Sequence, residues 1–290
     1  MYLLPTFKYL APSSLEGFLK LLDKNGKDFK VLAGGTDLII NLKKEEIQPK
    51  YVIDITKIPD LKLLRDAGNK IIIGSTVTYS DLLESPLISK EAPFLIEAAV
   101  TVGAVQIRNS VTLGGNIANA SPAADMIPPL IALGAKVKII NPKQEREIPL
   151  EELFLGPYKT KLSPVDLITE ISFSKIPPRT GTCFLKVGRR NALAISRLSV
   201  AVTLTLNSQG KIESASIVPG AVTPVPIRIR KAEDLLCGNT PGKELFEQAG
   251  KIVSEEVVGI TGPRYSTVYK EPVLFNLVKR SLILAAERCK

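Results

Sequence analysis

The sequence is 290 residues long, with 45% hydrophobic and 23% charged residues, which excludes a disordered or fibrous protein and allows two or three compact units. No apolar run reaches the roughly 20 residues that span a bilayer, and no basic leader precedes an apolar core, so we expect a mature cytoplasmic protein without a membrane span. The net charge of +9 is spread along the chain without a long basic run. We therefore expect solvated surface charge rather than a nucleic-acid-binding face.

Histidine is absent, which removes the commonest metal ligand and the usual general base for a serine or cysteine nucleophile. The three cysteines are odd in number and far apart, at Cys183, Cys237 and Cys289. This spacing predicts neither a disulfide framework nor a close-spaced metal site. We expect no metal site, and the sequence identifies no catalytic residue.

The first unit, residues 1–55, has the pattern of a small parallel-sheet module. A helix with 3.6-residue apolar spacing is predicted to end at the turn formed by Asn25 and Gly26. The elements predicted after it are a strand over 28–33, a helix over 36–46 capped by Thr36 or Asp37, and a strand over 51–55. The order of strand, tight turn, helix and strand is typical of a βαβ unit.

The second unit, residues 56–176, is predicted to be α+β. The expected helices follow a strand over 70–78, and later strands have antiparallel spacing. We expect helices after Thr78 and over 92–105 and 125–133, a loop over 110–125, and strands over 135–142, 146–150 and 165–174.

A linker is predicted over 176–181, where two prolines and a glycine oppose both helix and sheet. The third unit, residues 177–290, is predicted to be an α+β domain with an antiparallel sheet, because its strands precede its helices. The expected strands are 183–188, 198–207 and 211–220, and the expected helices are 231–237, 243–258 and 267–288.

The stretch "LAGGTDLI", residues 32–39, is a candidate anion site. Two glycines at a strand-to-helix turn let the main chain approach a ligand closely, and the first N–H groups of the helix are unpaired. The helix dipole favours an anion there, so the turn suits a phosphate. The alternative is a tight turn with a threonine cap. The better-known phosphate loops, G-x-G-x-x-G and G-x-x-x-x-G-K-[ST], do not occur in the chain.

The stretch "SVTLGGNIANASPAAD", residues 110–125, is a second candidate. Gly114 and Gly115 are expected to expose backbone N–H groups, and Thr112 and Asn116 add side-chain donors. Asp125 can only accept hydrogen bonds when ionised, so it suits sugar hydroxyls. The alternative is that Asp125 caps the following helix and the asparagines form turns. A ligand with two phosphates and a polyhydroxy arm would use both glycine pairs.

Three motifs, "LAGGTDL", "QIRNSVTLGGNIANASPAAD" and "LKVGRRNALAISRLSVA", resemble the FAD-binding medium subunit of the xanthine dehydrogenase and carbon monoxide dehydrogenase family of molybdenum hydroxylases. The resemblance covers essentially the whole chain, with the motifs in the family's order. It implies a two-subdomain FAD-binding fold of the vanillyl-alcohol-oxidase type followed by a C-terminal α+β domain. It also implies that both glycine turns embrace the pyrophosphate of FAD.

The resemblance assigns sixteen positions to the cofactor. Ile168 corresponds to an apolar flavin contact and Lys186 to a cofactor-contacting lysine, whereas their alternatives are a core residue and an exposed strand end. Val102 stands where some members place an aromatic ring over the flavin, so we expect an aliphatic wall or one that comes from elsewhere. The full set is Leu32, Ala33, Gly34, Gly35, Thr36, Asp37, Leu38, Ile39, Val102, Thr112, Gly114, Gly115, Asn116, Asp125, Ile168 and Lys186.

The function implied is electron transfer within an assembly. The chain would receive electrons from the iron–sulfur clusters of one partner subunit, while a molybdopterin-binding subunit oxidises the substrate. NAD+ or another acceptor would then take the electrons. The alternative is a self-contained FAD-dependent oxidase or reductase of the same superfold. Without histidine that enzyme could not carry a histidyl-linked flavin, and no acid–base constellation for a substrate is visible.

Overall fold

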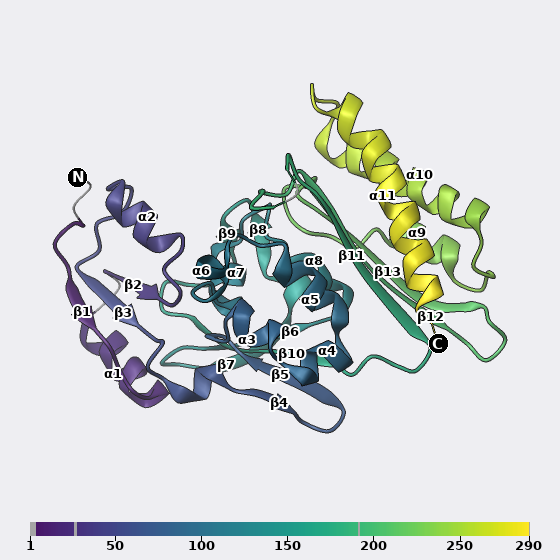
Figure 1. Cartoon of the computed structure of the whole chain (residues 1–290). Coiled ribbons are helices and arrows are strands. Elements are labelled where there is room, and N and C mark those ends of the chain that lie inside the picture. The colour runs from purple at the N-terminus through teal and green to yellow at the C-terminus, as the bar shows by residue number, and fades with distance from the viewer. Residues whose placement is uncertain (1–3, 26–27, 191, 290) are drawn as a thin grey trace.

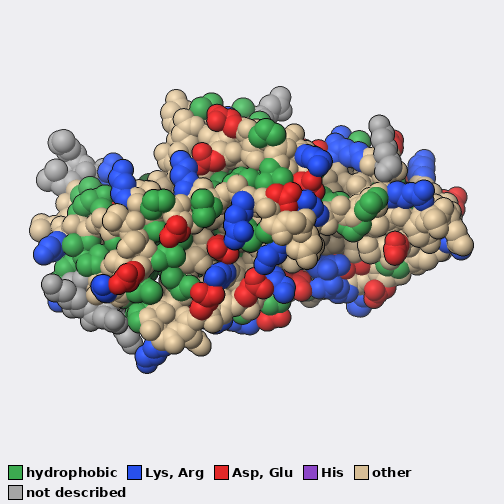
Figure 2. Space-filling view, turned by 90° about the horizontal axis from the view of Figure 1, so that it is seen from below, with side chains coloured by type: hydrophobic (Ala, Val, Ile, Leu, Met, Phe, Trp, Pro, Cys, Tyr) green, Lys and Arg blue, Asp and Glu red, His purple; other side chains and the backbone are tan. Residues whose placement is uncertain are grey.

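The computed structural model describes residues 4–25, 28–190 and 192–289, which form an elongated molecule (Figure 1). The N-terminal unit lies at one end, a middle unit follows, and a C-terminal sheet with long helices lies at the other end. None of the helices within these residues is both long enough and apolar enough to cross a bilayer. Basic and acidic side chains are intermixed on the face that Figure 2 shows.

The N-terminal unit has a parallel three-stranded sheet in the order β1-β3-β2. Helix α1 packs its apolar face on this sheet through Phe18 and Leu22, which are buried with Phe29 and Ile53. The bounds of its elements are β1 Lys8–Leu10, α1 Leu15–Asn25, β2 Phe29–Leu32, α2 Leu38–Lys43 and β3 Tyr51–Asp54.

Two features of this unit differ from the prediction. Strand β1 was not expected, because its three residues, Lys8–Leu10, are too few to show an alternating apolar pattern. Helix α2 is shorter than the predicted 36–46, and Asp37 at its N-cap makes no side-chain capping bond. The chain leaves this helix at Glu45, which adopts a left-handed conformation with φ 58°. The predicted stop at Gly26 lies outside the described residues.

The middle unit is built on an antiparallel five-stranded sheet in the order β4-β5-β10-β6-β7. Strand β10 is central, and a separate hairpin pairs β8 with β9. The strands are β4 Leu64–Asp66, β5 Lys70–Gly74, β6 Lys136–Ile140, β7 Glu145–Pro149, β8 Phe154–Gly156, β9 Lys159–Thr160 and β10 Leu167–Ser174. The helices are η1 Pro59–Lys62, α3 Tyr79–Leu83, α4 Pro86–Glu91, α5 Pro93–Val100, α6 Val105–Arg108, α7 Leu113–Asn119, α8 Ile127–Ala132 and η2 Leu150–Glu152.

Two predictions for this unit were wrong. The helix expected over 92–105 is broken into α5 and α6, because Gly103 takes a left-handed conformation with φ 50° between them. The loop expected over 110–125 contains α7, which tertiary contacts and a cap at Thr112 stabilise despite its two glycines. This helix ends where Ala120 turns left-handed at φ 50°. The helix expected after Thr78 is present, and Thr78 and Asp81 form a capping box with reciprocal bonds at its start.

The C-terminal unit is an antiparallel sheet in the order β11-β12-β13, and its long helices cover one face (Figure 1). The other face packs on the middle unit, where Phe184, Ala201 and Val218 join the core formed by α5 and α8. The elements are β11 Thr180–Val187, β12 Leu198–Leu206, β13 Ile212–Gly220, α9 Arg230–Leu236, α10 Lys243–Thr261 and α11 Thr267–Glu287.

The predicted linker over 176–181 is shorter in the structure. Thr180 and Gly181 are already paired with β12, opposite Thr205 and Leu204. A Cβ added to Gly181 would lie 1.7 Å from the carbonyl oxygen of Ala285 in α11. The glycine therefore allows close approach of a strand and a helix, which the sequence pattern alone does not distinguish from a loop.

Candidate functional site

A cavity of about 320 Å³ lies between the N-terminal and middle units. Its walls come from the turn between β2 and α2, from the first turns of α7 and from the start of β10. Eleven of the sixteen predicted positions line it: Ala33, Gly34, Gly35, Thr36, Asp37, Leu38, Thr112, Gly114, Gly115, Asn116 and Ile168.

The two glycine turns meet in space, because Gly34 packs directly on the backbone before α7. A Cβ added to Gly34 would lie 1.9 Å from the carbonyl oxygen of Ser110. Two hydrogen bonds to the segment that follows β5 hold the second turn in place. Gly114 N–H donates to Ser75 O at 2.8 Å, and Leu113 N–H donates to Val77 O at 3.0 Å. The two turns therefore meet, as the sequence predicted, because Gly34 has no side chain to hold their backbones apart.

The first turn carries free hydrogen-bond donors. Within residues 4–25, 28–190 and 192–289, the backbone N–H groups of Gly34, Gly35, Thr36 and Asp37 have no hydrogen-bond acceptor. Gly35 adopts φ 70°, a left-handed conformation that glycine tolerates at no steric cost. These N–H groups are available to an acceptor bound in the cavity.

The second turn differs from the prediction, because its N–H groups are already used. Gly114 donates to Ser75, Gly115 donates to the Thr112 side chain at 3.2 Å, and Asn116 donates to Thr112 O at 2.9 Å. Both glycines lie inside the first turn of α7 rather than before it. The two glycines and Asn116 therefore offer a ligand no free N–H group, whereas the N–H of Thr112 has no acceptor among the described residues.

Ile168 is a core residue that also lines the cavity. It is 4% exposed and precedes an irregularity in the pairing of β10 with β6. Just before it, Asp166 also lines the cavity and accepts from Arg146 at 2.6 Å and from Asn141 at 2.7 Å. Burial would raise the pKa of Asp166, but these hydrogen bonds and that from Ser163 N–H outweigh it and lower the pKa to about 2.

Asp125 and Lys186 lie outside the cavity, in a buried ion pair of their own. Lys186 Nζ donates to Asp125 Oδ2 at 2.7 Å and to Thr101 O at 3.1 Å, and Ser196 Oγ donates to the other carboxylate oxygen. The Asp125 side chain is 5% exposed and the Lys186 side chain 9%. Burial raises the pKa of Asp125, and Lys186 and Ser196 oppose that rise. Lys186 is thus no exposed strand end, and Asp125 does not cap α8, whose N-cap is Met126.

The other three predicted positions also lie away from the cavity. Leu32 and Ile39 support the first turn from behind, because a Cβ on Gly35 would lie 3.1 Å from each of their side chains. Val102 packs against the middle core. Its carbonyl oxygen accepts from Arg108 at 3.1 Å.

Several cavity residues escaped the sequence analysis. Ser75 follows Gly74 at the end of β5, and a polar residue directly after a buried strand was the available signal. Lys30 and Asn41 carried no comparable signal, because each lies in an ordinary strand or helix. The cavity residues that were not predicted are Lys30, Val31, Asn41, Ile47, Ile55, Ser75, Val111, Ala118, Asn119, Leu162, Asp166 and Leu167.

Known proteins are similar to this chain along nearly its whole length. Residues 5–176 match the family described as the FAD binding domain in molybdopterin dehydrogenase, and residues 183–285 match the CO dehydrogenase flavoprotein C-terminal domain. The carbon monoxide dehydrogenase medium chain of Hydrogenophaga pseudoflava is 31% identical over 98% of this chain and 99% of its own. The 6-hydroxypseudooxynicotine dehydrogenase complex subunit alpha of Paenarthrobacter nicotinovorans is 32% identical over 99% of this chain and 96% of its own.

The fold is shared as well. A solved chain of the Hydrogenophaga pseudoflava carbon monoxide dehydrogenase superposes with a TM-score of 0.92 at 32% identity, covering 99% of this chain and 100% of that one. The fold and the family matches define an FAD-binding flavoprotein of the oxidoreductase class. The chain belongs to the family of FAD-binding medium subunits of the molybdopterin dehydrogenases, which includes carbon monoxide dehydrogenase and xanthine dehydrogenase subunits. The resemblance inferred from the three motifs is confirmed.

Proposed function

We propose that this chain is the electron-transferring flavoprotein subunit of a molybdenum hydroxylase and holds FAD in the cavity between its two glycine turns. The observation that carries the proposal is the direct contact of these turns around a cavity with unpaired N–H groups on one wall. A pyrophosphate offers only acceptors to the protein, and free backbone N–H groups are the complementary donors. The residues present therefore fit a dinucleotide.

The chain's own residues would position the cofactor, and bound FAD would supply one-electron and hydride transfer. The N–H groups of Gly34, Gly35, Thr36 and Asp37 are proposed to hold the pyrophosphate. Ile168 is proposed to form an apolar part of the wall. Both roles are supported by the presence of these residues in the cavity lining.

The buried pair of Asp125 and Lys186 is proposed to lie beside the flavin end of the cofactor. A lysine ammonium has three N–H donors, and two of them reach Asp125 and Thr101. The third donor is available to the cofactor. Because Asp125 balances the charge of Lys186, we propose that the lysine acts on the flavin mainly through this N–H donor.

The electron donor and acceptor are proposed from the family. The relatives are named as a medium chain or a complex subunit of dehydrogenases and as the medium subunit of a nicotine 6-hydroxylase. We propose that an iron–sulfur subunit delivers electrons to this chain, that a molybdopterin-binding subunit oxidises the substrate, and that NAD+ or another acceptor takes the electrons.

The test begins with FAD binding by the purified full-length chain. We expect stoichiometric binding with a flavin absorption spectrum, followed by reduction of the bound flavin when the reduced iron–sulfur subunit is added. A chain that remains colourless after reconstitution would contradict the FAD site. A chain that oxidises an organic substrate without partners would contradict the electron-transfer role and favour a self-contained oxidase.

A further inference from the structure

Ser75 occupies the junction between three walls of the cavity. It follows β5, its N–H donates to Thr169 O at 2.9 Å in β10, and its carbonyl oxygen accepts from Gly114 N–H at 2.8 Å in α7. A Cβ added to Gly114 would lie 2.5 Å from the Cβ of Ser75, so the two residues are in direct contact. The main chain of Ser75 is therefore fixed on both sides, and the residue lines the cavity.

The hydroxyl of Ser75 has no hydrogen-bond partner in the described part of the chain. The residue is only 2% exposed. Buried side-chain hydroxyls are nearly always paired, because an unpaired one loses its bonds to water without replacement. The Oδ1 atom of Asn116, in the same cavity wall, is likewise buried and without a partner among the described residues. Two such atoms on one cavity indicate a bound group that would satisfy them.

The chemistry of that group follows from what the wall lacks. The N–H groups of Gly114, Gly115 and Asn116 are used inside the fold, so of the main-chain donors in this turn only that of Thr112 lacks an acceptor among the described residues. A phosphate oxygen only accepts, and a serine hydroxyl can donate to it. Asn116 Oδ1 only accepts, so its partner must be a donor such as a sugar or ribityl hydroxyl.

We infer that the Ser75 hydroxyl donates a hydrogen bond to the pyrophosphate of FAD, in addition to the free N–H groups of the first turn. This inference rests on the proposed function, because it assigns a further ligand within the same cavity. It makes Ser75 a donor that replaces the glycine-turn N–H groups already used by α7.

The test compares Ser75→Ala with two controls in the full-length chain freed of FAD. Thr76→Val and Ser216→Ala remove buried hydroxyls that also have no partner among the described residues but do not line the cavity. Dissociation constants for FAD, and separately for ADP, are measured by calorimetry. We expect Ser75→Ala to weaken both ligands by about tenfold, since a hydrogen bond to a charged group is lost, and the controls to stay within about twofold of wild type.

A second readout separates ligand binding from folding. Ser75→Ala removes a hydroxyl that is unpaired in the unliganded fold, so its unfolding temperature without FAD should not fall, while the rise caused by saturating FAD should shrink. Unchanged affinity for FAD in Ser75→Ala would overturn the inference. Weakened FAD with unchanged ADP would also overturn it, by assigning the hydroxyl to the flavin side. A wild-type chain that binds neither ligand would instead refute the FAD site itself.

Discussion

Gly34 is the residue on which the meeting of the two turns depends. A side chain there would have to displace the Ser110 carbonyl, from which an added Cβ would lie 1.9 Å away. We predict that Gly34→Ala separates the turns, lowers the free energy of unfolding by about 1–3 kcal/mol and weakens FAD binding more than tenfold. Calorimetry and urea unfolding measure the two effects. Gly156→Ala is the control, since nothing lies within 4 Å of an added Cβ at Gly156. Equal behaviour of the two variants would contradict the prediction.

The buried pair of Asp125 and Lys186 gives a second prediction at this scale. Lys186→Met would leave Asp125 enclosed with Ser196 as its remaining side-chain partner. We expect the free energy of unfolding to fall by about 3–5 kcal/mol, because a buried charge without its counter-ion is costly. Combining Lys186→Met with Asp125→Asn should recover most of the loss in urea unfolding. A double variant no more stable than Lys186→Met would show that the charge is not the cause.

Sequence reasoning found these residues to different degrees. Glycine pairs and hydroxyl donors have a local signature, and eleven of the sixteen predicted positions line the cavity. The second partner of Asp125, the hydroxyl of Ser196, could not be found in this way, because Ser196 lies 71 residues further along the chain. Nor could the pattern reveal that α7 would use the N–H groups of Gly114 and Gly115.

At the scale of elements, Asp166 fixes the start of β10 to the β6–β7 hairpin through Arg146 and Asn141. Its pKa is about 2 in the folded chain, below the ordinary 3.8, so folding favours the ionised form. This contribution, about 2 kcal/mol, is fully present above about pH 4 and is lost as the pH falls towards 2.

We therefore predict that Asp166→Asn lowers the free energy of unfolding at pH 7 and flattens its dependence on pH between about 4 and 2. Urea unfolding at a series of pH values measures both effects. Asp60→Asn, on an exposed turn of η1, is the control. If the free energies of unfolding of Asp166→Asn and of wild type change in parallel with pH over that range, the prediction is wrong.

Most long elements were predictable, and the short ones were not. Strands β5, β10, β12 and β13 are strongly apolar or alternate clearly, so tertiary contacts reinforce a local preference. Strand β1 has only three residues, and it forms because it pairs with β3 rather than because of its own sequence pattern. Helix α7 contains two glycines and forms because the cap at Thr112 and the surrounding core outweigh propensity.

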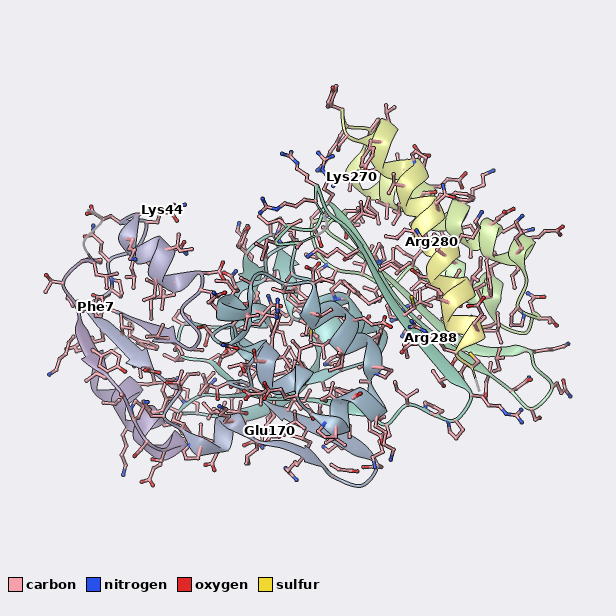
Figure 3. The ribbon with its side chains drawn as sticks, in the orientation of Figure 1. Phe7, Lys44, Glu170, Lys270, Arg280 and Arg288 are labelled. Atoms are coloured by element: carbon pink, nitrogen blue, oxygen red, sulfur yellow. The ribbon has the colours of Figure 1, made fainter. Side chains whose placement is uncertain are left out.

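At the scale of the whole molecule, the units share cores across their borders. Glu97 in α5 accepts from Phe184 N–H at 2.8 Å on the free edge of β11, and it pairs with Arg288 at 2.7 Å. Arg288 lies at the end of α11, where Figure 3 labels it, and also donates to Thr182 O at 2.6 Å. One carboxylate thus joins the middle unit to both the sheet and the last helix of the C-terminal unit.

We predict that Glu97→Ala lowers the free energy of unfolding by about 1.5–3 kcal/mol, because the N–H of Phe184 loses a charged acceptor. Thermal and urea unfolding measure the change. Glu255→Ala is the control, since its pair with Lys251 at 3.8 Å is exposed on α10 and should matter by less than about 0.5 kcal/mol. Similar losses in both variants would contradict the bridging role.

Every residue lining the cavity falls between Lys30 and Ile168. Protein synthesis proceeds from the N-terminus, and domains generally fold as they emerge. Both glycine turns and β10 therefore belong to the part of the chain that is synthesised before the C-terminal unit, although Phe184, Ala201 and Val218 of that unit complete the middle core. The C-terminal sheet contributes no residue to the cavity lining and acts on the cavity only through the core that it shares with the middle unit.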